Sequence, residues 1–248
     1  MPSALVTGAS RGIGASIAHA LAGAEFRVGV HYNRSEAAAR NVFGGLPGSG
    51  HVLLRADIAD APQAEQLVRH AISALDGLDV LVNNAGIFEY HPVADVGYQA
   101  WQDAWRTTIG TNLIAAANLS YCAARHMIKQ GGGRIVNISS RGAFRGEPDA
   151  PAYGASKAGM NAMGQSLARA LAPHNVLVFT IAPGWVDTDM AASTLNSPDG
   201  EAVKAQSPLR RVATAEEIAR IALFCAKDAP AYMTAAIIDA NGASYLRT

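Results

Sequence analysis

The chain has 248 residues, of which half are hydrophobic, and it carries 20 basic and 20 acidic side chains, so its formal net charge is zero. This length fits one large α/β domain, and the balanced charge argues against nucleic acid or an anionic membrane surface as the main partner. No apolar run approaches the length of a membrane span, and an apolar, strand-like run already begins at residue 4, so we expect neither a membrane-spanning helix nor a signal peptide.

Strand-like and helix-like segments alternate along the whole chain. Short apolar runs bounded by turn residues predict buried strands at 4–7, 28–32, 52–54, 78–82, 135–138, 176–181 and 236–239. Apolar residues at helical spacing predict helices at 13–24, 35–43, 62–76, 97–128, 153–172 and 214–226. This alternation predicts a Rossmann-type, doubly wound parallel sheet with helices on both faces, in a single α/β domain over residues 1–248.

Capping residues and glycines set the expected boundaries of these elements. Ser35, Asp60 and a capping box over 214–217 are expected to open three of the helices. Glycine-rich stretches at 44–50 and 131–133 predict turns. The stretch from about 190 to 208 lacks strong periodicity, and with its flanks, at about 185–210, it is predicted to form a mobile lid over the substrate.

The glycine turn after the first strand reads Thr7-Gly8-Ala9-Ser10-Arg11-Gly12-Ile13-Gly14. Its glycines are spaced G-x-x-x-G-x-G between a predicted strand and a predicted helix. Glycines in this context let the backbone approach a pyrophosphate at the helix N-terminus, where free N–H groups and the helix dipole favour an anion. The turn therefore indicates a dinucleotide site.

A second motif is suited to acid–base chemistry. Tyr153 and Lys157 are four residues apart, so on a helix they share one face. A phenol has a reference pKa of about 10, and an ammonium beside it is expected to lower that pKa. The hydroxyl of Ser140, or of Ser139 as the second choice, can donate a hydrogen bond to a substrate oxygen that gains charge. The set predicts interconversion of a carbonyl and an alcohol.

These motifs together resemble the short-chain dehydrogenase/reductase family, and the resemblance covers nearly the whole chain. It rests on the glycine turn, Tyr153-x-x-x-Lys157, Ser140, Asn112, Asn83-Asn84-Ala85-Gly86 and Pro183-Gly184, in the order and spacing of the family. The resemblance implies reversible hydride transfer between a nicotinamide and a carbonyl carbon, with Asn112, Ser140, Tyr153 and Lys157 as catalytic residues. It also implies that Asn112 bulges its helix and holds a water in a proton relay, although a core amide bonded to the backbone is the alternative.

The resemblance further implies which residues hold the cofactor. Asp57 is expected to contact the adenine amino group, Ile58 to pack near the adenine ring, and the Val186 backbone to bond the nicotinamide carboxamide. The expected set is Gly8, Ser10, Arg11, Gly12, Ile13, Gly14, Tyr32, Asn33, Arg34, Asp57, Ile58, Asn84, Ala85, Gly86, Tyr153, Lys157, Pro183, Gly184, Val186 and Thr188.

The cofactor is predicted to be NADP(H) in preference to NAD(H). Family members that use NAD carry an acidic residue at the end of the second strand, where it binds the ribose hydroxyls. Tyr32 occupies that position here, Asn33 and Arg34 follow, and no carboxylate is present. Arg11 lies in the glycine turn, so two arginines without an acid favour a 2′-phosphate.

The sequence leaves the substrate open beyond a small-molecule carbonyl or alcohol. A partly apolar pocket is suggested by Phe88, Tyr90, Phe144, Trp185 and Met190, although core or lid packing explains each of them better. Arg141 and Arg145 could meet an anionic substrate, but a solvated loop is the preferred interpretation of both.

Several functions therefore remain possible. The chain resembles 3-oxoacyl-carrier-protein reductases in general pattern, yet the stretches expected to dock a carrier, 129–132 and 173–175, contain little positive charge. Reduction of a free ketone, sugar or steroid-like molecule is equally open. A cofactor-binding regulatory protein is disfavoured by the complete catalytic set, and an epimerase or dehydratase by the lack of room for a second domain.

Assembly, location and metal binding complete the expectations. The small residues of the 153–172 helix and the apolar last strand suggest a homotetramer, with a dimer second. Cys122 and Cys225 are interpreted as small buried side chains, which fits a reducing cytoplasm. The seven dispersed histidines show no paired ligand spacing, so each is interpreted as a surface or core residue and no metal site is predicted.

Overall fold

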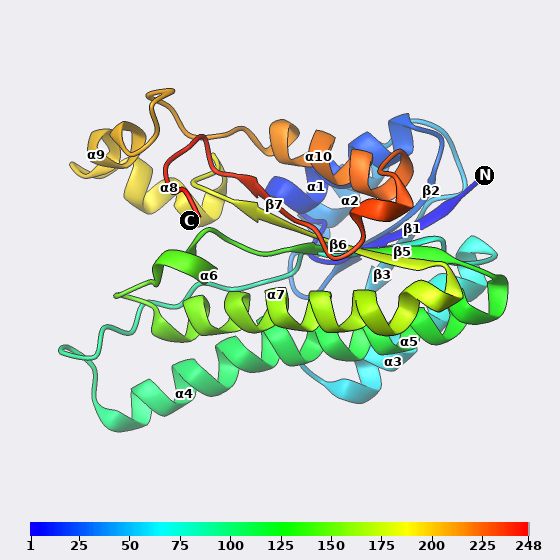
Figure 1. Cartoon of the computed structure of the whole chain (residues 1–248), viewed down its shortest axis with the longest axis horizontal. Coiled ribbons are helices and arrows are strands. Elements are labelled where there is room, and N and C mark those ends of the chain that lie inside the picture. Colours follow the sequence, from blue (N-terminus) through cyan, green and yellow to red (C-terminus); the bar gives the residue numbers. More distant parts are fainter. Residues whose placement is uncertain (248) are drawn as a thin grey trace.

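Seven parallel strands form one sheet in the order β3-β2-β1-β4-β5-β6-β7 (Figure 1). The computed structural model describes residues 1–247, so Thr248, the last residue of the predicted domain, lies outside the described residues. The strands are β1 (Ser3–Val6), β2 (Arg27–Tyr32), β3 (Val52–Arg55), β4 (Val80–Asn83), β5 (Gly133–Ile138), β6 (Val176–Pro183) and β7 (Ile237–Ala240). The predicted parallel sheet is confirmed.

Helices connect successive strands, as a parallel sheet requires. They are α1 (Gly12–Gly23), α2 (Glu36–Gly44), α3 (Ala61–Leu75), α4 (Tyr98–Ile109), α5 (Ala115–Gln130), α6 (Gly142–Arg145), α7 (Pro151–Leu171), α8 (Asp189–Leu195), α9 (Gly200–Ala205) and α10 (Ala215–Lys227). A π-helix at Gly110–Ile114 joins α4 to α5, and single 3-10 turns lie at Ala172–His174 and Ala231–Met233.

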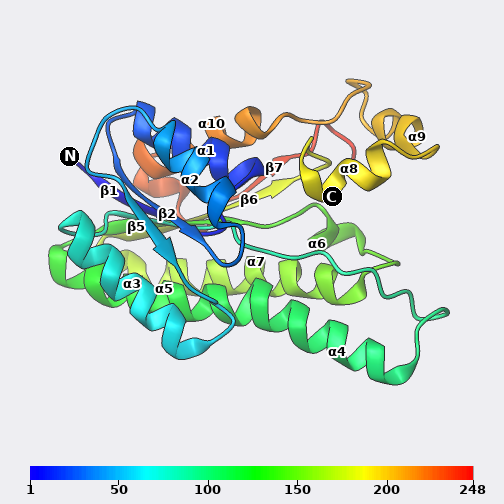
Figure 2. The same cartoon turned by 180° about the vertical axis from the view of Figure 1, so that it is seen from behind.

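Both faces of the sheet are covered, which makes the fold a Rossmann-type three-layer sandwich in a single domain. Helices α1, α2 and α10 lie on one face, and α3, α5 and α7 lie on the other, with α4 extending beyond the sheet (Figures 1 and 2). The strands are accordingly buried on both sides: every residue of β1, β4 and β6 is buried. Two hydrophobic clusters, one on each face, form the core.

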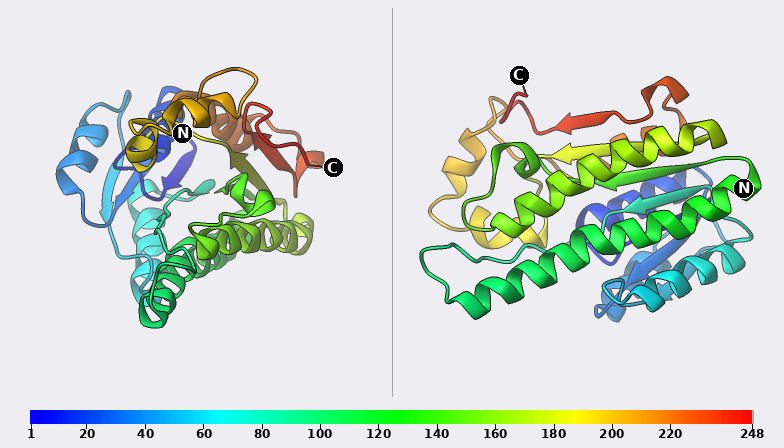
Figure 3. Two further views of the ribbon diagram at one scale, coloured as in Figure 1. Left: turned by 90° about the vertical axis from the view of Figure 1, so that its left-hand side faces the viewer. Right: turned by 60° about the horizontal axis from the view of Figure 1, so that its bottom comes forward.

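The strand order reverses between β1 and β4, which are neighbours although two strands separate them in sequence. In doubly wound sheets the crevice outside the carboxyl ends of the strands at such a switch point is where ligands bind. The turns after β1, β4, β5 and β6 all leave the sheet at this edge, and α8 and α9 extend beyond it (Figure 3). The fold therefore brings the sequence motifs to one end of the sheet.

Most of the predicted boundaries agree with the structure to within a few residues. The Asp60 side chain accepts a hydrogen bond from the Gln63 backbone N–H, and Thr214 and Glu217 form the predicted capping box. Ser35 is at the N-cap of α2, as predicted, but its side chain makes no capping hydrogen bond, so the prediction that it caps the helix is wrong.

Two regions differ from the sequence-based expectation. The long helix predicted over 97–128 is interrupted by the π-helix, because five residues there take a wider turn around Asn112. The predicted lid has more order than its weak periodicity indicated, since it contains the short helices α8 and α9.

Candidate active site

Tyr153 and Lys157 lie in the first turns of α7, which starts at Pro151 and packs along β6. The Lys157 side chain is buried, at 4% exposure, and its Nζ atom donates a hydrogen bond of 2.8 Å to the Ile138 carbonyl at the end of β5. Nζ lies 5.7 Å from the centre of the Tyr153 ring, and the Phe88 ring packs edge-on against Tyr153 at 5.1 Å. The predicted pair is therefore fixed at the carboxyl end of β5.

The serines that follow β5 have different partners. Ser139 Oγ donates to the backbone carbonyl of Lys157 at 3.2 Å, so this hydroxyl ties the strand to α7. Ser140 Oγ accepts from the Gly142 N–H at 3.0 Å and interacts with the Tyr153 phenol. Because the Ser140 hydroxyl is the one paired with Tyr153, the geometry favours Ser140 over Ser139.

Burial shifts the pKa values of Tyr153 and Lys157 in opposite directions. Burial raises the pKa of Tyr153 to about 12, the hydrogen bond with Ser140 opposes this, and the charge of Glu147 adds to it. Burial also lowers the pKa of Lys157 to about 8. The structure differs from the expectation that Lys157 lowers the pKa of Tyr153, because loss of solvation outweighs the other influences on the buried phenol.

Asn112 is the central residue of the π-helix and is fully buried. Its Oδ1 atom accepts from the Ile87 N–H at 2.8 Å, and its Nδ2 atom donates to the Ile87 carbonyl at 2.9 Å and to Ser156 Oγ at 3.1 Å. The predicted bulge is present, and so is the backbone pairing given as its alternative. A Cβ added to Gly86 would lie 3.3 Å from Asn112 Oδ1 and 3.4 Å from Lys157 Nζ, which brings the two polar side chains to one glycine.

The glycine turn forms a cradle at the N-terminus of α1. Gly8 and Gly12 have positive φ angles of 63° and 55°, a conformation that favours glycine. A Cβ on Gly12 would lie 3.2 Å from the Thr188 side chain, and one on Gly14 would clash with the Gly8 carbonyl. Helix α1 has no side-chain cap and no acidic residue in its first turn. Its free N–H groups therefore suit an anion such as a pyrophosphate, so the residues present fit a dinucleotide.

The turn after β4 closes the cradle from the other side. Asn84 Nδ2 donates to the Thr7 and Gly8 carbonyls at 2.8 and 3.1 Å. A Cβ on Gly8 would lie 2.9 Å from Cα of Ala85. The structure thus brings together Gly8, Asn84 and Ala85, and Gly86 follows in the chain. Ser10 and Ile13 lie half-buried in the glycine turn and at the start of α1.

The residues predicted to hold the adenosine end lie after β2 and β3. Tyr32 and Ile58 are buried, whereas Asn33 and Asp57 are half-buried. Asp57 Oδ1 accepts from the Ala59 N–H at 3.1 Å, and Asp57 Oδ2 has no hydrogen-bond partner among residues 1–247. Arg34 is exposed, and the exposed Arg11 guanidinium lies 3.8 Å from the Asp189 carboxylate.

The end of β6 supplies the last predicted contacts. Pro183 and Val186 are buried, and a Cβ on Gly184 would lie 3.0 Å from Cα of Asn241, so β6 and the segment after β7 approach closely there. Thr188 Oγ1 donates to the Val186 carbonyl at 3.4 Å. This segment faces the glycine cradle through the contact between Thr188 and Gly12.

The loop between Ser140 and Tyr153 is less solvated than the sequence indicates. Arg141 is only 3% exposed, and its guanidinium donates to Ser244 Oγ and Gln206 Oε1, so the solvated-loop interpretation is wrong for Arg141. Burial lowers the pKa of Arg141 to about 10. Arg145 is exposed, and its guanidinium lies 3.7 Å from the Glu147 carboxylate. Burial raises the pKa of Glu147. Arg141 thus ties the active-site loop to the lid and to the C-terminal segment.

The side chains suggested for an apolar pocket do not form one wall. Phe88, Tyr90 and Met190 are exposed. Phe144 packs beneath the Arg247 guanidinium at 4.5 Å, and Trp185 lines a separate pocket of about 160 Å³ between the lid, α10 and the segment after β7. The packing interpretation therefore fits Phe144.

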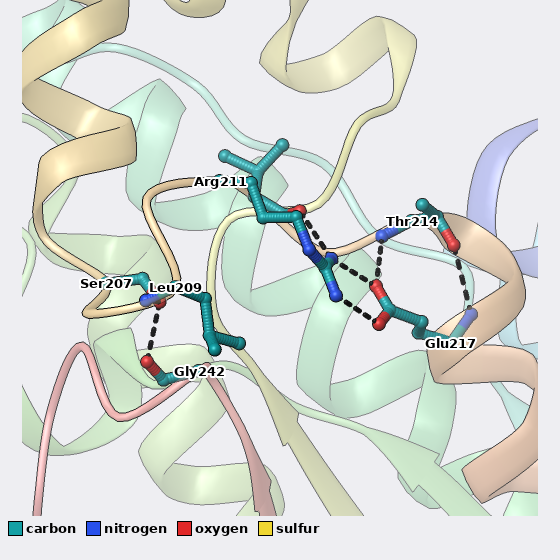
Figure 4. Close-up of polar contacts among 7 residues, drawn as sticks. Ser207, Leu209, Arg211, Thr214, Glu217 and Gly242 are labelled. Carbon is teal, nitrogen blue, oxygen red and sulfur yellow. Dashed lines mark hydrogen bonds and ion pairs between the residues drawn. The ribbon is translucent and has the colours of Figure 1, made fainter.

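The segment that leads from the lid to α10 is held at two points (Figure 4). Ser207 Oγ donates to the Gly242 carbonyl at 2.6 Å, and the Arg211 guanidinium binds both oxygens of Glu217 at 2.7 Å. Glu217 also accepts from the Thr214 N–H at 2.9 Å. These contacts fix the part of the chain between α9 and α10. Helices α8 and α9 form the outer part of the predicted lid.

Two histidines contribute to the site without a signal that the sequence analysis could use. His91 is buried, its Nε2 accepts from the Ala152 N–H at 3.1 Å, and its Nδ1 donates to the Glu89 carbonyl at 2.7 Å. It therefore joins the loop after β4 to the start of α7, one residue before Tyr153. His31 contacts the glycine turn. Neither belongs to a spaced motif, so each resembles an ordinary core histidine in the sequence.

Two negative findings apply to residues 1–247. No group of three or more His, Cys, Asp or Glu side chains in this part of the chain is placed to hold a metal ion. None of the helices within the described range combines the length and apolar character needed to cross a membrane.

Of the two cysteines, Cys225 is buried as expected, while Cys122 is half-buried.

Comparison with known proteins agrees with this geometry. The family model described as short chain dehydrogenase matches residues 2–199. The 3-oxoacyl-[acyl-carrier-protein] reductase FabG of Staphylococcus aureus (strain Mu50) is 37% identical over 246 residues, which is 98% of each chain. The reductase of the same name from Aquifex aeolicus (strain VF5) is 35% identical over 245 residues, covering 97% of this chain and 96% of the relative.

A solved structure supports the same relationship. The crystal structure of a candidate short-chain alcohol dehydrogenase from Sinorhizobium meliloti 1021 matches with a TM-score of 0.89 and 37% identity, covering 98% of this chain and 96% of that one. Fold, motifs and relatives agree over nearly the full length. The chain therefore belongs to the short-chain dehydrogenase family, as an oxidoreductase that interconverts an alcohol and a carbonyl group with a nicotinamide dinucleotide.

Proposed function

We propose that this protein is an NADP(H)-dependent oxidoreductase that reduces a small carbonyl compound to a secondary alcohol, and that the reaction is reversible. The observation that carries the proposal is that Ser140, Tyr153 and Lys157 lie at the same carboxyl edge of the sheet as the glycine cradle. The bound nicotinamide would supply the hydride in reduction and accept it in oxidation.

Tyr153 is the proposed proton donor. Its pKa of about 12 keeps the phenol protonated at neutral pH, which is the form that a carbonyl reduction needs. Ser140 and Tyr153 would both donate hydrogen bonds to the carbonyl oxygen as it gains negative charge. The Ser140 hydroxyl is close enough to the phenol to oppose the rise of its pKa, so both donors would reach one oxygen atom.

Lys157 and Asn112 are the proposed supporting residues. The Lys157 ammonium is anchored by the Ile138 carbonyl, and it would bind the nicotinamide ribose with its remaining N–H groups. Asn112 is fixed by Ile87 and Ser156, and both polar side chains lie near Gly86. A water between them would connect the phenol to solvent and restore its proton. The π-helix supports this role because Asn112 is its central residue and, like Lys157 Nζ, the Asn112 Oδ1 atom lies beside Gly86.

The cofactor is proposed to lie along the carboxyl edge of the sheet. The turn after β1 would hold the pyrophosphate, the residues after β2 and β3 the adenosine, and the segment after β6 the nicotinamide carboxamide. The residues proposed for the pyrophosphate end are Gly8, Ser10, Gly12, Ile13, Gly14, Asn84, Ala85 and Gly86. Those proposed for the adenosine are Tyr32, Asn33, Asp57 and Ile58, and those proposed for the nicotinamide carboxamide are Pro183, Gly184, Val186 and Thr188.

NADP(H) is proposed over NAD(H) on the charges near the adenosine ribose. Tyr32 and Asn33 occupy the end of β2, and the first carboxylate after them, Glu36, binds Arg40 at 2.7 Å. Arg34 is exposed and has no ion-pair partner within the described residues, and the exposed Arg11 belongs to the glycine turn, where its guanidinium lies 3.8 Å from the Asp189 carboxylate. A 2′-phosphate would be stabilised by both guanidinium groups.

The substrate is proposed to be a small or medium free carbonyl compound, and 3-oxoacyl-carrier-protein reduction is the second candidate. The relatives named FabG favour the second candidate. The ends of α5 and α7, where we expect a carrier to dock, supply only Lys129 and His174 in the stretches 129–132 and 173–175. This low positive charge favours a free substrate.

A homotetramer in the cytoplasm is proposed, with a dimer as the second state. Gly154, Gly159 and Gly164 of α7 contact elements of the same chain, so they are not available to a partner. The exposed small side chains of α7 are Ala155, Ala158, Ala162, Ser166 and Ala170, and they support close packing against a second α7. The segment 185–210, with α8 and α9, is the proposed lid over the substrate.

The experiment that tests the function is a substrate panel. NADPH oxidation is followed by its absorbance with ketones, aldehydes, quinones and 3-oxoacyl thioesters, and NADH is run in parallel. We expect stoichiometric NADPH consumption with at least one free carbonyl compound. Turnover with carrier thioesters alone would favour the second candidate. Conversion without net NADPH consumption would indicate an epimerase or dehydratase, and tight NADPH binding without conversion of any panel member would favour a regulatory protein.

A further inference from the structure

The imidazole of His31 joins three segments that surround the dinucleotide cradle. His31 lies in β2 and is 2% exposed. Its Nδ1 atom accepts from the Gly8 N–H at 3.1 Å, and its Nε2 atom lies 3.1 Å from the Ala56 carbonyl oxygen. Gly8 belongs to the glycine turn and Ala56 immediately precedes Asp57, so one side chain spans from the pyrophosphate side of the cradle to the adenine side.

These contacts fix the tautomer of the ring. A backbone N–H can only donate, so Nδ1 must present its lone pair to Gly8. A carbonyl oxygen can only accept, so Nε2 must carry the proton toward Ala56. Both bonds exist only in the neutral imidazole. Burial keeps the ring neutral, because it lowers the pKa of His31 to about 4 against the opposing influences of the Ala56 hydrogen bond and the Asp57 charge.

Two further hydrogen bonds hold the glycine turn. Asn84 Nδ2 donates to the Gly8 carbonyl at 3.1 Å, and the Ala9 N–H donates to the His31 backbone carbonyl at 2.8 Å. Gly8 has a positive φ angle of 63° and can adopt many other conformations when unconstrained. Without His31 its N–H group would be a half-buried donor without this partner, which costs free energy and favours a different turn.

We propose that His31 is a positioning residue for dinucleotide binding: its Nδ1 acceptor holds Gly8 in the conformation that opens the cradle to the pyrophosphate. This inference rests on the proposed function, because it assumes that the cradle holds a dinucleotide. It assigns to His31 a role in cofactor affinity and none in proton transfer to the substrate.

Two substitutions separate the two ring contacts. The amide oxygen of Asn is one bond from Cγ, as Nδ1 is in histidine, so His31→Asn keeps an acceptor for the Gly8 N–H and loses the Ala56 bond. The amide nitrogen of Gln is two bonds from Cγ, as Nε2 is, so His31→Gln keeps the Ala56 bond and loses the acceptor. A merely structural histidine would respond similarly to both changes.

The test is NADPH affinity, measured by cofactor fluorescence, with the melting temperature recorded for each variant. We expect His31→Asn to bind NADPH within about threefold of the wild type. His31→Gln should bind it about tenfold more weakly, since this change leaves the half-buried Gly8 N–H without its acceptor. Equal affinities in both variants, or a loss in His31→Asn alone, would overturn the inference. A wild-type protein that binds neither NADPH nor NADH would instead overturn the proposed function.

An NMR measurement on the wild type checks the premise independently of binding. Long-range proton–nitrogen spectra at pH 7 should show His31 as a neutral ring with its proton on Nε2. A proton on Nδ1 would contradict the Gly8 contact and the inference with it.

Discussion

The Nζ atom of Lys157 lies 5.7 Å from the centre of the Tyr153 ring, and burial moves the pKa values of the two groups apart. The pKa of the Tyr153 phenol rises to about 12, and the pKa of the Lys157 ammonium falls to about 8. At neutral pH the tyrosine is therefore a proton donor and the lysine still carries its charge. This combination suits the reductive direction of the proposed reaction.

The first prediction concerns pH. Because the pKa of Lys157 is lowered to about 8, its charge is present below this pH and is lost above it. Carbonyl reduction should therefore slow as the pH rises through about 8, while Tyr153 stays protonated. The measurement is kcat between pH 6 and 10, with substrate and NADPH saturating. Lys157→Met should remove this inflection, and the exposed Lys129→Met should keep it.

The second prediction concerns Asn112. Asn112→Ala removes hydrogen bonds to the N–H and carbonyl of Ile87 and to Ser156, and leaves both half-buried backbone groups of Ile87 without these partners. Unfolding by urea should show a loss of about 3 kcal/mol, together with reduced turnover. The exposed Asn41→Ala is the matched control and should change the unfolding free energy by less than about 0.5 kcal/mol. Unchanged stability in Asn112→Ala would contradict the contacts described here.

The third prediction concerns the choice of cofactor. Replacing Arg11 and Arg34 together by serine should weaken NADPH binding by at least about tenfold, because two charge-assisted bonds to the 2′-phosphate are lost. NADH binding should change by less than about threefold, and fluorescence titration measures both. Arg40→Ser is the control, since Arg40 pairs with Glu36 on α2. Equal losses for NADPH and NADH would place the two arginines away from the 2′-phosphate.

The fourth prediction links His31 to acid stability. Its pKa is lowered from 6.5 to about 4 by burial, so the unfolded chain binds a proton between these values that the folded chain does not. The free energy of unfolding should therefore be at its full value above about pH 6.5 and should fall by about 3 kcal/mol as the pH decreases toward 4. Asp57 is the charged group that opposes this shift. In urea unfolding at each pH, His31→Asn should lose less stability than the wild type over this range.

Sequence patterns predicted the strands, the glycine cradle and the Tyr153–Lys157 pair because each depends on local spacing. The parallel order and the crossovers follow from alternating elements and from handedness rules. The π-helix at Asn112 was expected only through a resemblance to known proteins, since nothing in the spacing of residues 97–128 distinguishes a wider turn from a regular helix.

Long-range contacts account for what the sequence did not predict. Arg141 looks like a loop cation in the sequence, but Gln206 and Ser244, 65 and 103 residues away, bury its guanidinium. His31 and His91 each bond a backbone group far along the chain, so no local pattern marks them. The raised pKa of Tyr153 has the same origin, because burial depends on the whole fold.

The central claim is that the Tyr153 hydroxyl delivers a proton to the substrate oxygen, and Tyr153→Phe tests it most directly. The ring and its packing against Phe88 are kept and only the hydroxyl is removed. The measurement is single-turnover oxidation of bound NADPH by the best carbonyl substrate, with NADPH affinity measured beside it. The account predicts a rate lower by about 10²–10⁴-fold with NADPH affinity within about threefold of the wild type. A near-normal rate in Tyr153→Phe with bound NADPH would contradict it.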